Sequence, residues 1–144
     1  MDDAVAKGAK ILCGGKAQGP LYPPTVVYGV TPDMRIYSEE SFGPAKSVII
    51  ANDAEDAVRI ANDTSYGLSS SVFSRDVTKA LKIAERLEFG ICHINGSTVH
   101  DEPQMPFGGM KDSGWGRFGG RTGLDEFTEV RWVTIRRSPT SYPI

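Results

Sequence analysis

Cysteine and histidine are scarce in this sequence of 144 residues, which contains two of each. The two cysteines, Cys13 and Cys92, lie far apart and form no C-x-x-C pair, so the sequence argues against a disulfide framework and against a zinc site. We therefore expect a reducing, cytoplasmic location. No basic segment followed by an apolar segment comes after Met1, so no secretory signal is predicted.

Long runs of one charge and long apolar runs are also missing. The chain has 16 basic and 18 acidic residues and a net charge of −2, without a basic block that would bind phosphates, so we expect no nucleic-acid partner. No stretch approaches the roughly 18 apolar residues of a membrane span, and we expect no membrane partner. The composition, 40% hydrophobic and 24% charged, is typical of a folded domain. This length predicts burial of roughly 70% of the unfolded surface.

The middle of the chain alternates between strand and helix patterns. Asp53 and Asp76 are each placed to cap the start of a helix whose apolar residues recur every three or four positions. The predicted order is strand 45–51, helix 54–64, strand 69–73, a helix from 77, and strand 91–95. This order predicts an α/β fold with a parallel βαβαβ sheet and two right-handed crossovers.

The flanking segments are less regular. Residues 10–13 and 25–30 have strand patterns, but the pattern alone does not place them in a sheet. Residues 131–137 alternate strictly between polar and apolar side chains, which predicts a strand with one face available to a partner. The start of the chain has the pattern of the last turn of a helix that lacks a beginning. We therefore expect the chain to be a fragment of a longer protein.

A glycine-rich loop at 106–117 is the first candidate site. Its glycines permit close backbone approach, and Lys111 and Arg117 could hold an anion there. The loop lacks the Walker order of glycine, lysine and hydroxyl residue and does not follow a strand. We therefore favour a structural loop in which the glycines pack backbone against backbone.

Two adjacent carboxylates, Glu39 and Glu40, form the second candidate site. Adjacent carboxylates repel each other unless one of them is engaged elsewhere. Either both face water, or one accepts hydrogen bonds from a pair of ligand hydroxyls while Phe42 supplies an apolar wall. The residues themselves leave both interpretations open.

The other polar candidates give little support for catalysis. Cys92 and His93 are neighbours on one strand and point to opposite faces, so they form no catalytic dyad. We expect Cys13 to be a small buried apolar residue. Residues 100–102 are expected to be solvated rather than to bind a metal. Asn95 follows a parallel strand, where functional groups are often presented.

Two segments carry a family resemblance. Residues 38–44 (SEESFGP) resemble the E-E-x-F-G-P motif of the NAD(P)-dependent aldehyde dehydrogenase superfamily, and residues 106–117 (PFGGMKDSGWGR) resemble its P-F-G-G-x-K-x-S-G-x-G-R motif. Residues 62–73 resemble the A-N-x-x-x-Y-G-L segment of the same family. Residues 92–105 resemble the branch that acts on salicylaldehyde, benzaldehyde and vanillin. The resemblance therefore covers essentially the whole chain.

The resemblance implies a reaction and residue roles. Members of this family oxidise an aldehyde to an acid through a cysteine thiolate, with hydride transfer to a nicotinamide. Glu40 would bind the ribose hydroxyls on the nicotinamide side, and Phe42 would lie near the nicotinamide. NAD is the expected cofactor, with NADP left open. The residues expected to line the aldehyde tunnel are Phe107, Thr98, Val99 and His100.

The same resemblance implies that important parts are elsewhere. The family's nucleophilic cysteine, general-base glutamate, oxyanion-hole asparagine and dinucleotide-binding domain lie upstream of the matching segment, so we assign no catalytic residue here. We expect residues 1–128 to be the C-terminal part of the catalytic domain, inactive alone. Residues 129–144 would be a strand and tail that form a homo-oligomer through 131–137. The alternative is a non-catalytic assembly module that associates through this strand.

Overall fold

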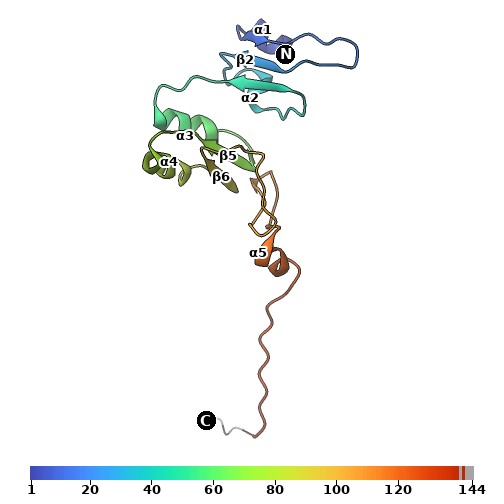
Figure 1. Ribbon diagram of the computed structural model, residues 1–144. Coiled ribbons are helices and arrows are strands. Elements are labelled where there is room, and N and C mark those ends of the chain that lie inside the picture. Colours follow the sequence, from blue (N-terminus) through green and yellow to red (C-terminus); the bar gives the residue numbers. More distant parts are fainter. Residues whose placement is uncertain (140, 142–144) are drawn as a thin grey trace.

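The computed structural model describes residues 1–139 and residue 141. The elements succeed one another along an elongated molecule, and the segment after α5 extends away from the rest (Figure 1). The helices are α1 (Asp2–Ala6), α2 (Arg35–Ser38), α3 (Ala54–Asn62), α4 (Val77–Ala84) and α5 (Gly120–Asp125). The strands are β1 (Lys10–Cys13), β2 (Thr25–Tyr28), β3 (Ala45–Val48), β4 (Tyr66–Gly67), β5 (Ser69–Val72), β6 (Ile91–Ile94) and β7 (Met110–Lys111).

The first sheet has the order β1-β2-β3, and its central strand β2 contributes to the main apolar cluster. Strand β2 pairs antiparallel with β1 and parallel with β3. Val27 of β2 is fully buried because it packs with side chains from α1 and from the segment before α2. The buried members of this cluster are Ala4, Ala9, Val27, Val30 and Met34. The cluster fixes the position of α2 and of the loop that follows it.

Strands β5 and β6 form the βαβ crossover predicted from the sequence. They pair in parallel with each other, and α4 connects them along the chain. The two predicted helix caps are confirmed: an Asp53 carboxylate oxygen accepts the Asp56 N–H at 2.9 Å, and an Asp76 oxygen accepts the Lys79 N–H at 2.9 Å. The short sheet β4-β7 ties this unit to the glycine-rich loop.

The single βαβαβ sheet predicted from the sequence is wrong. Strand β3 pairs with β2 and not with β5, so α3 connects two separate sheets. Periodicity identifies the type of an element, but the pairing partner is chosen by tertiary contacts. Here β2 presents a parallel partner to all four residues of β3.

The predicted strand at 131–137 is not formed in the described residues. The segment is extended but pairs with no other strand within residues 1–139. An alternating sequence gives a strand only where a neighbouring backbone supplies the ladder hydrogen bonds. Its apolar residues Trp132, Val133 and Ile135 are exposed. Residues 140 and 142–144 of the predicted tail lie outside the described residues.

The surface of the chain is large for its mass. Its accessible surface is 11307 Å², whereas a compact monomer of this mass exposes about 7300 Å². The chain therefore buries only about half of its unfolded surface, and the predicted 70% is wrong. The excess of about 4000 Å² arises because the elements form three separate small sheets, and the main apolar cluster packs with the first sheet alone. The exposed side chains include large apolar ones, among them Phe42, Trp115 and Trp132.

Within the described part of the chain, the helices are all too short or too polar to span a bilayer.

Candidate functional site

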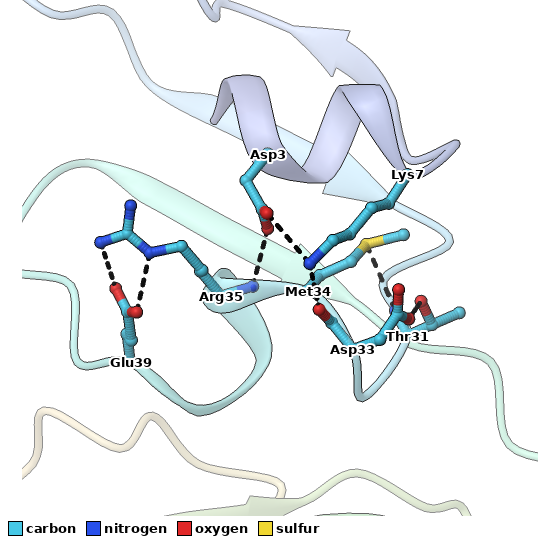
Figure 2. Close-up of polar contacts among 7 residues, drawn as sticks. All are labelled: Asp3, Lys7, Thr31, Asp33, Met34, Arg35 and Glu39. Carbon is cyan, nitrogen blue, oxygen red and sulfur yellow. Dashed lines mark hydrogen bonds and ion pairs between the residues drawn. The ribbon is translucent and has the colours of Figure 1, made fainter.

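The two adjacent carboxylates have different surroundings in the structure. Glu39 accepts two hydrogen bonds from the Arg35 guanidinium, Nε to Oε1 at 2.8 Å and Nη2 to Oε2 at 2.8 Å (Figure 2). The guanidinium lowers the pKa of the Glu39 carboxyl, chiefly through this hydrogen bonding. Glu40 forms no hydrogen bond or ion pair with residues 1–139. The structure thus identifies Glu40 as the carboxylate that remains available.

Helix α2, which precedes these carboxylates, is anchored by helix α1. The Asp3 Oδ2 atom accepts the backbone N–H of Arg35 at 2.9 Å, and Asp3 Oδ1 lies 3.0 Å from Lys7 Nζ (Figure 2). The Lys7 ammonium also donates to the carbonyl oxygen of Asp33. The pKa of Asp3 is lowered, first by the Arg35 N–H and then by Lys7. Residue 35 is therefore held through both its backbone and its side chain.

An open cavity of about 630 Å³ lies between α1, α2 and the loop that leads to β3. Glu40 and Phe42 both line it, and Phe42 is 96% exposed. The volume lies in the range of about 300–1000 Å³ that is typical of small-molecule pockets. A ligand here would meet a free carboxylate and an aromatic face side by side.

Lys111 in the glycine-rich loop is occupied by protein contacts. Its Nζ atom donates to the carbonyl oxygens of Asn62 at 2.8 Å and Thr64 at 3.1 Å, and it lies 2.8 Å from Glu88 Oε2. A cation beside the last carbonyl groups of α3 stabilises the end of that helix. These contacts join α3, the segment before β6 and the loop, so Lys111 is bound within the protein.

The remaining cation and the glycines of this loop also have structural roles. Arg117 Nη1 donates to the carbonyl oxygens of Gly109 at 2.7 Å and Gly116 at 2.8 Å. A Cβ atom at Gly108 would lie 2.6 Å from the Gly116 carbonyl oxygen, and one at Gly90 would overlap the Gly108 carbonyl group. The backbones therefore pack directly on each other. This geometry supports the structural interpretation of the loop over anion binding.

Phe107 lies at a second, smaller cavity. Its backbone pairs with that of Phe118, with N–H to oxygen distances of 2.8 and 2.7 Å. The cavity has a volume of about 340 Å³. Its lining consists of Asp101, Glu102, Pro103, Met105, Phe107, Phe118 and Gly119. The aromatic pair gives this cavity an apolar wall.

The other three predicted tunnel residues lie on the exposed turn after β6 and do not line this cavity. The Thr98 carbonyl oxygen accepts the Ser69 hydroxyl at 3.1 Å, and the Val99 side chain is 88% exposed. The His100 Nε2 atom lies 3.2 Å from Glu102 Oε1. His100 thereby connects this turn to a residue of the cavity wall.

Two further sequence predictions meet different outcomes. Asn95 holds a turn: its Oδ1 accepts the Ser74 N–H at 2.8 Å and its Nδ2 donates to the Ser74 carbonyl oxygen at 2.9 Å, so its amide is engaged within the protein. The prediction that Cys13 is buried is wrong, because β1 is an edge strand whose side chains are all exposed. Across the described ranges, no three His, Cys, Asp or Glu residues are grouped to hold a metal ion.

Sequence reasoning missed the contacts that Asp3 and Lys7 make with the segment before Glu40. Nothing in the local sequence connects residues 3 and 35, because the contact depends on how α1 packs against α2. A usable signal did exist for Arg35 and Glu39, which have the i,i+4 spacing at which opposite charges meet on a helix.

The fold and both cavities thus define an α/β protein segment with two open cavities. The sequence matches the aldehyde dehydrogenase family over residues 1–133, and the chain belongs to this family. It is 53% identical over 144 residues to vanillin dehydrogenase of Pseudomonas fluorescens, covering 100% of this chain and 30% of that protein. It is 55% identical over 141 residues to salicylaldehyde dehydrogenase of Pseudomonas putida, covering 98% and 29%. The chain therefore spans about 30% of the length of these relatives.

Solved structures show the same fold. Salicylaldehyde dehydrogenase from Pseudomonas putida G7, complexed with salicylaldehyde, superposes with a TM-score of 0.94 at 52% identity and covers 99% of this chain and 30% of that one. A Mycobacterium tuberculosis aldehyde dehydrogenase complexed with NAD+ has a TM-score of 0.86 at 37% identity, with coverages of 97% and 30%. An NADP complex of glyceraldehyde-3-phosphate dehydrogenase from Bacillus halodurans C-125 has a TM-score of 0.81 at 42% identity, with coverages of 85% and 26%.

Proposed function

We propose that this chain is the C-terminal part of the catalytic domain of an NAD(P)-dependent dehydrogenase that oxidises an aromatic aldehyde to a carboxylic acid. The observation that carries the proposal is the pairing of a free carboxylate, Glu40, with an exposed aromatic ring, Phe42, at one cavity. Similarity to proteins named for vanillin and salicylaldehyde supports the substrate class. NAD is the proposed cofactor, and NADP is the alternative.

The chemistry of the two residues fits a nicotinamide nucleotide. An ionised carboxylate accepts hydrogen bonds through two oxygens, so Glu40 can receive both hydroxyls of a ribose. The ring of Phe42 offers an apolar face to the planar nicotinamide. When bound, the cofactor accepts a hydride. These residues hold its nicotinamide end in place, and neither of them transfers a proton.

The aldehyde is proposed to bind where Phe107 lies. The paired backbones of Phe107 and Phe118 fix one aromatic wall, which suits an aromatic ring of the substrate. Thr98, Val99 and His100 are proposed as outer neighbours of this site. A Phe107→Ala variant should raise the KM for an aromatic aldehyde while the KM for NAD stays unchanged.

The cofactor role is tested in the full-length dehydrogenase that contains this segment. A Glu40→Gln variant keeps the shape of the side chain but removes its charge, and a hydrogen bond to a charged group is worth about 1.5–3 kcal/mol. The KM for NAD should therefore rise by about 13- to 160-fold. A Lys46→Ala variant, at an exposed position of β3, is the control. An unchanged KM for NAD in Glu40→Gln would contradict the proposal.

The 144-residue chain is proposed to be inactive alone. Cys13 and Cys92 line neither cavity, so the nucleophile is proposed to come from the remainder of the enzyme. Incubation of the chain with NAD and salicylaldehyde should produce no NADH above the blank. Turnover that a Cys13→Ser or Cys92→Ser change abolishes would overturn this part of the proposal.

The second proposed function is assembly. The exposed apolar side chains within 131–137 favour pairing of this extended segment with another subunit, whether the chain acts inside an enzyme or as an assembly module. Size-exclusion chromatography should show association that truncation after Thr128 abolishes. A monomer of unchanged size with and without the segment would contradict this proposal.

A further inference from the structure

Arg35 binds one of the two adjacent carboxylates that line the 630 Å³ cavity. Two adjacent negative charges repel each other, and they compete for the same ligand hydroxyls. The guanidinium binds Glu39 through two parallel hydrogen bonds of 2.8 Å, while Glu40 stays unpaired in the described chain. We propose that Arg35 is a positioning residue that restrains Glu39 and leaves Glu40 free to bind the cofactor. This inference rests on the cofactor role proposed above for Glu40.

The position of Arg35 is itself fixed by its neighbours. Its backbone N–H donates to Asp3, which is held in turn by Lys7 (Figure 2). Its carbonyl oxygen accepts the Glu39 N–H at 2.9 Å. A bidentate arginine also fixes the plane of the carboxylate that it binds, which a lysine ammonium does not do. Glu39 is therefore tied by both backbone and side chain, and Glu40 follows it directly.

The charged side chains that line the cavity are mostly acidic. Four carboxylate residues line the cavity: Asp2, Asp3, Glu39 and Glu40. Among its described lining residues, Arg35 is the one with a basic side chain. Without Arg35, the Glu39 carboxylate gains freedom to approach Glu40 and its ligand. Removing the charge of Glu39 as well should then restore binding of the cofactor by Glu40.

The test uses steady-state kinetics of the full-length dehydrogenase that contains this segment. Arg35→Ala should raise the KM for NAD about fivefold, the factor expected at the upper end for a surface ion pair. The kcat and the KM for the aldehyde should stay within about twofold. Arg35→Lys should raise the KM for NAD by less than Arg35→Ala, because lysine keeps the charge but lacks the bidentate geometry that restrains Glu39. Lys46→Ala is again the control for loss of a cation nearby in sequence.

The decisive comparison is the double variant Arg35→Ala/Glu39→Gln. We expect its KM for NAD to return to within about twofold of the parent enzyme, because the unrestrained charge is gone. A purely structural role of Arg35 predicts no such rescue. An unchanged KM in Arg35→Ala, or a raised KM that Glu39→Gln does not restore, would overturn the inference. If these results occur while Glu40→Gln still raises the KM for NAD, only the positioning role of Arg35 is contradicted. An unchanged KM for NAD in Glu40→Gln would contradict both that role and the cofactor role of Glu40.

Discussion

Gly90 allows the loop that carries Phe107 to pack against the start of β6. A Cβ atom at this position would overlap the carbonyl oxygen of Gly108, lie 2.9 Å from its carbonyl carbon and lie 3.1 Å from the Gly109 Cα. All three atoms belong to backbone, which cannot rotate away as a side chain can. Gly90→Ala should therefore cost about 1–3 kcal/mol, as for other overpacked sites.

This cost should show as local opening of the loop. The amide of Phe107 donates to the Phe118 carbonyl oxygen at 2.8 Å and reports on the packed state through its hydrogen-exchange rate. A penalty of about 1–3 kcal/mol corresponds to an opening constant that is about 5- to 160-fold larger. Gly96→Ala is the control, because a Cβ atom there would lie 3.5 Å from the His93 Cβ, an ordinary contact. Equal exchange rates of the Phe107 amide in both variants would show that Gly90 is not required for the packing of this loop.

Three other changes should have measurable results. Lys111→Met should lower the stability to urea by about 1.5–3 kcal/mol, because it removes the ion pair with Glu88 and the hydrogen bonds to two carbonyl oxygens. Exposed Lys82→Met should not lower it, and equal urea midpoints in the two variants would contradict a stabilising role of Lys111. Asp3 has a lowered pKa, so its contribution to stability is present above its unfolded pKa and is lost as the pH falls through the folded value. Asp3→Asn should flatten this loss below about pH 4 in unfolding experiments, and an unchanged acid limb would contradict it. Hydrogen bonding to Asp63 raises the pKa of Tyr37. The contribution of this hydrogen bond to stability is therefore present below about pH 10 and is lost as the pH rises through the folded pKa of Tyr37. In Tyr37→Phe, the melting temperature should not show this loss of stability at alkaline pH. The same pH dependence in the variant and the parent would exclude the Tyr37–Asp63 hydrogen bond as the cause of the loss.

Local features of the fold could be predicted from the sequence. Asp53 and Asp76 cap their helices because an aspartate at that position reaches the N–H three residues later without help from the rest of the protein. The pairing of strands could not be predicted in this way. Whether β3 lies beside β2 or β5 depends on contacts between residues far apart in the sequence, and the predicted single sheet was wrong for that reason.

The candidate site was predicted in part. The sequence singled out Glu39, Glu40 and Phe42, and the structure places all three at one cavity. The family resemblance favoured Glu40, but the residues themselves did not indicate which carboxylate is free, since that depends on how Arg35 is held by Asp3. The prediction that Cys13 is buried was wrong, because exposure on an edge strand follows from the order of strands in the sheet, which local composition does not encode.

A crystal structure of the full-length dehydrogenase with NAD bound tests the proposed role of Glu40 most directly. We expect the Glu40 carboxylate to lie within hydrogen-bond distance of both ribose hydroxyls on the nicotinamide side, with Phe42 against the nicotinamide and Glu39 still bound to Arg35. A cofactor held by Glu39, or one that does not reach the cavity of Glu40 and Phe42, would contradict this role.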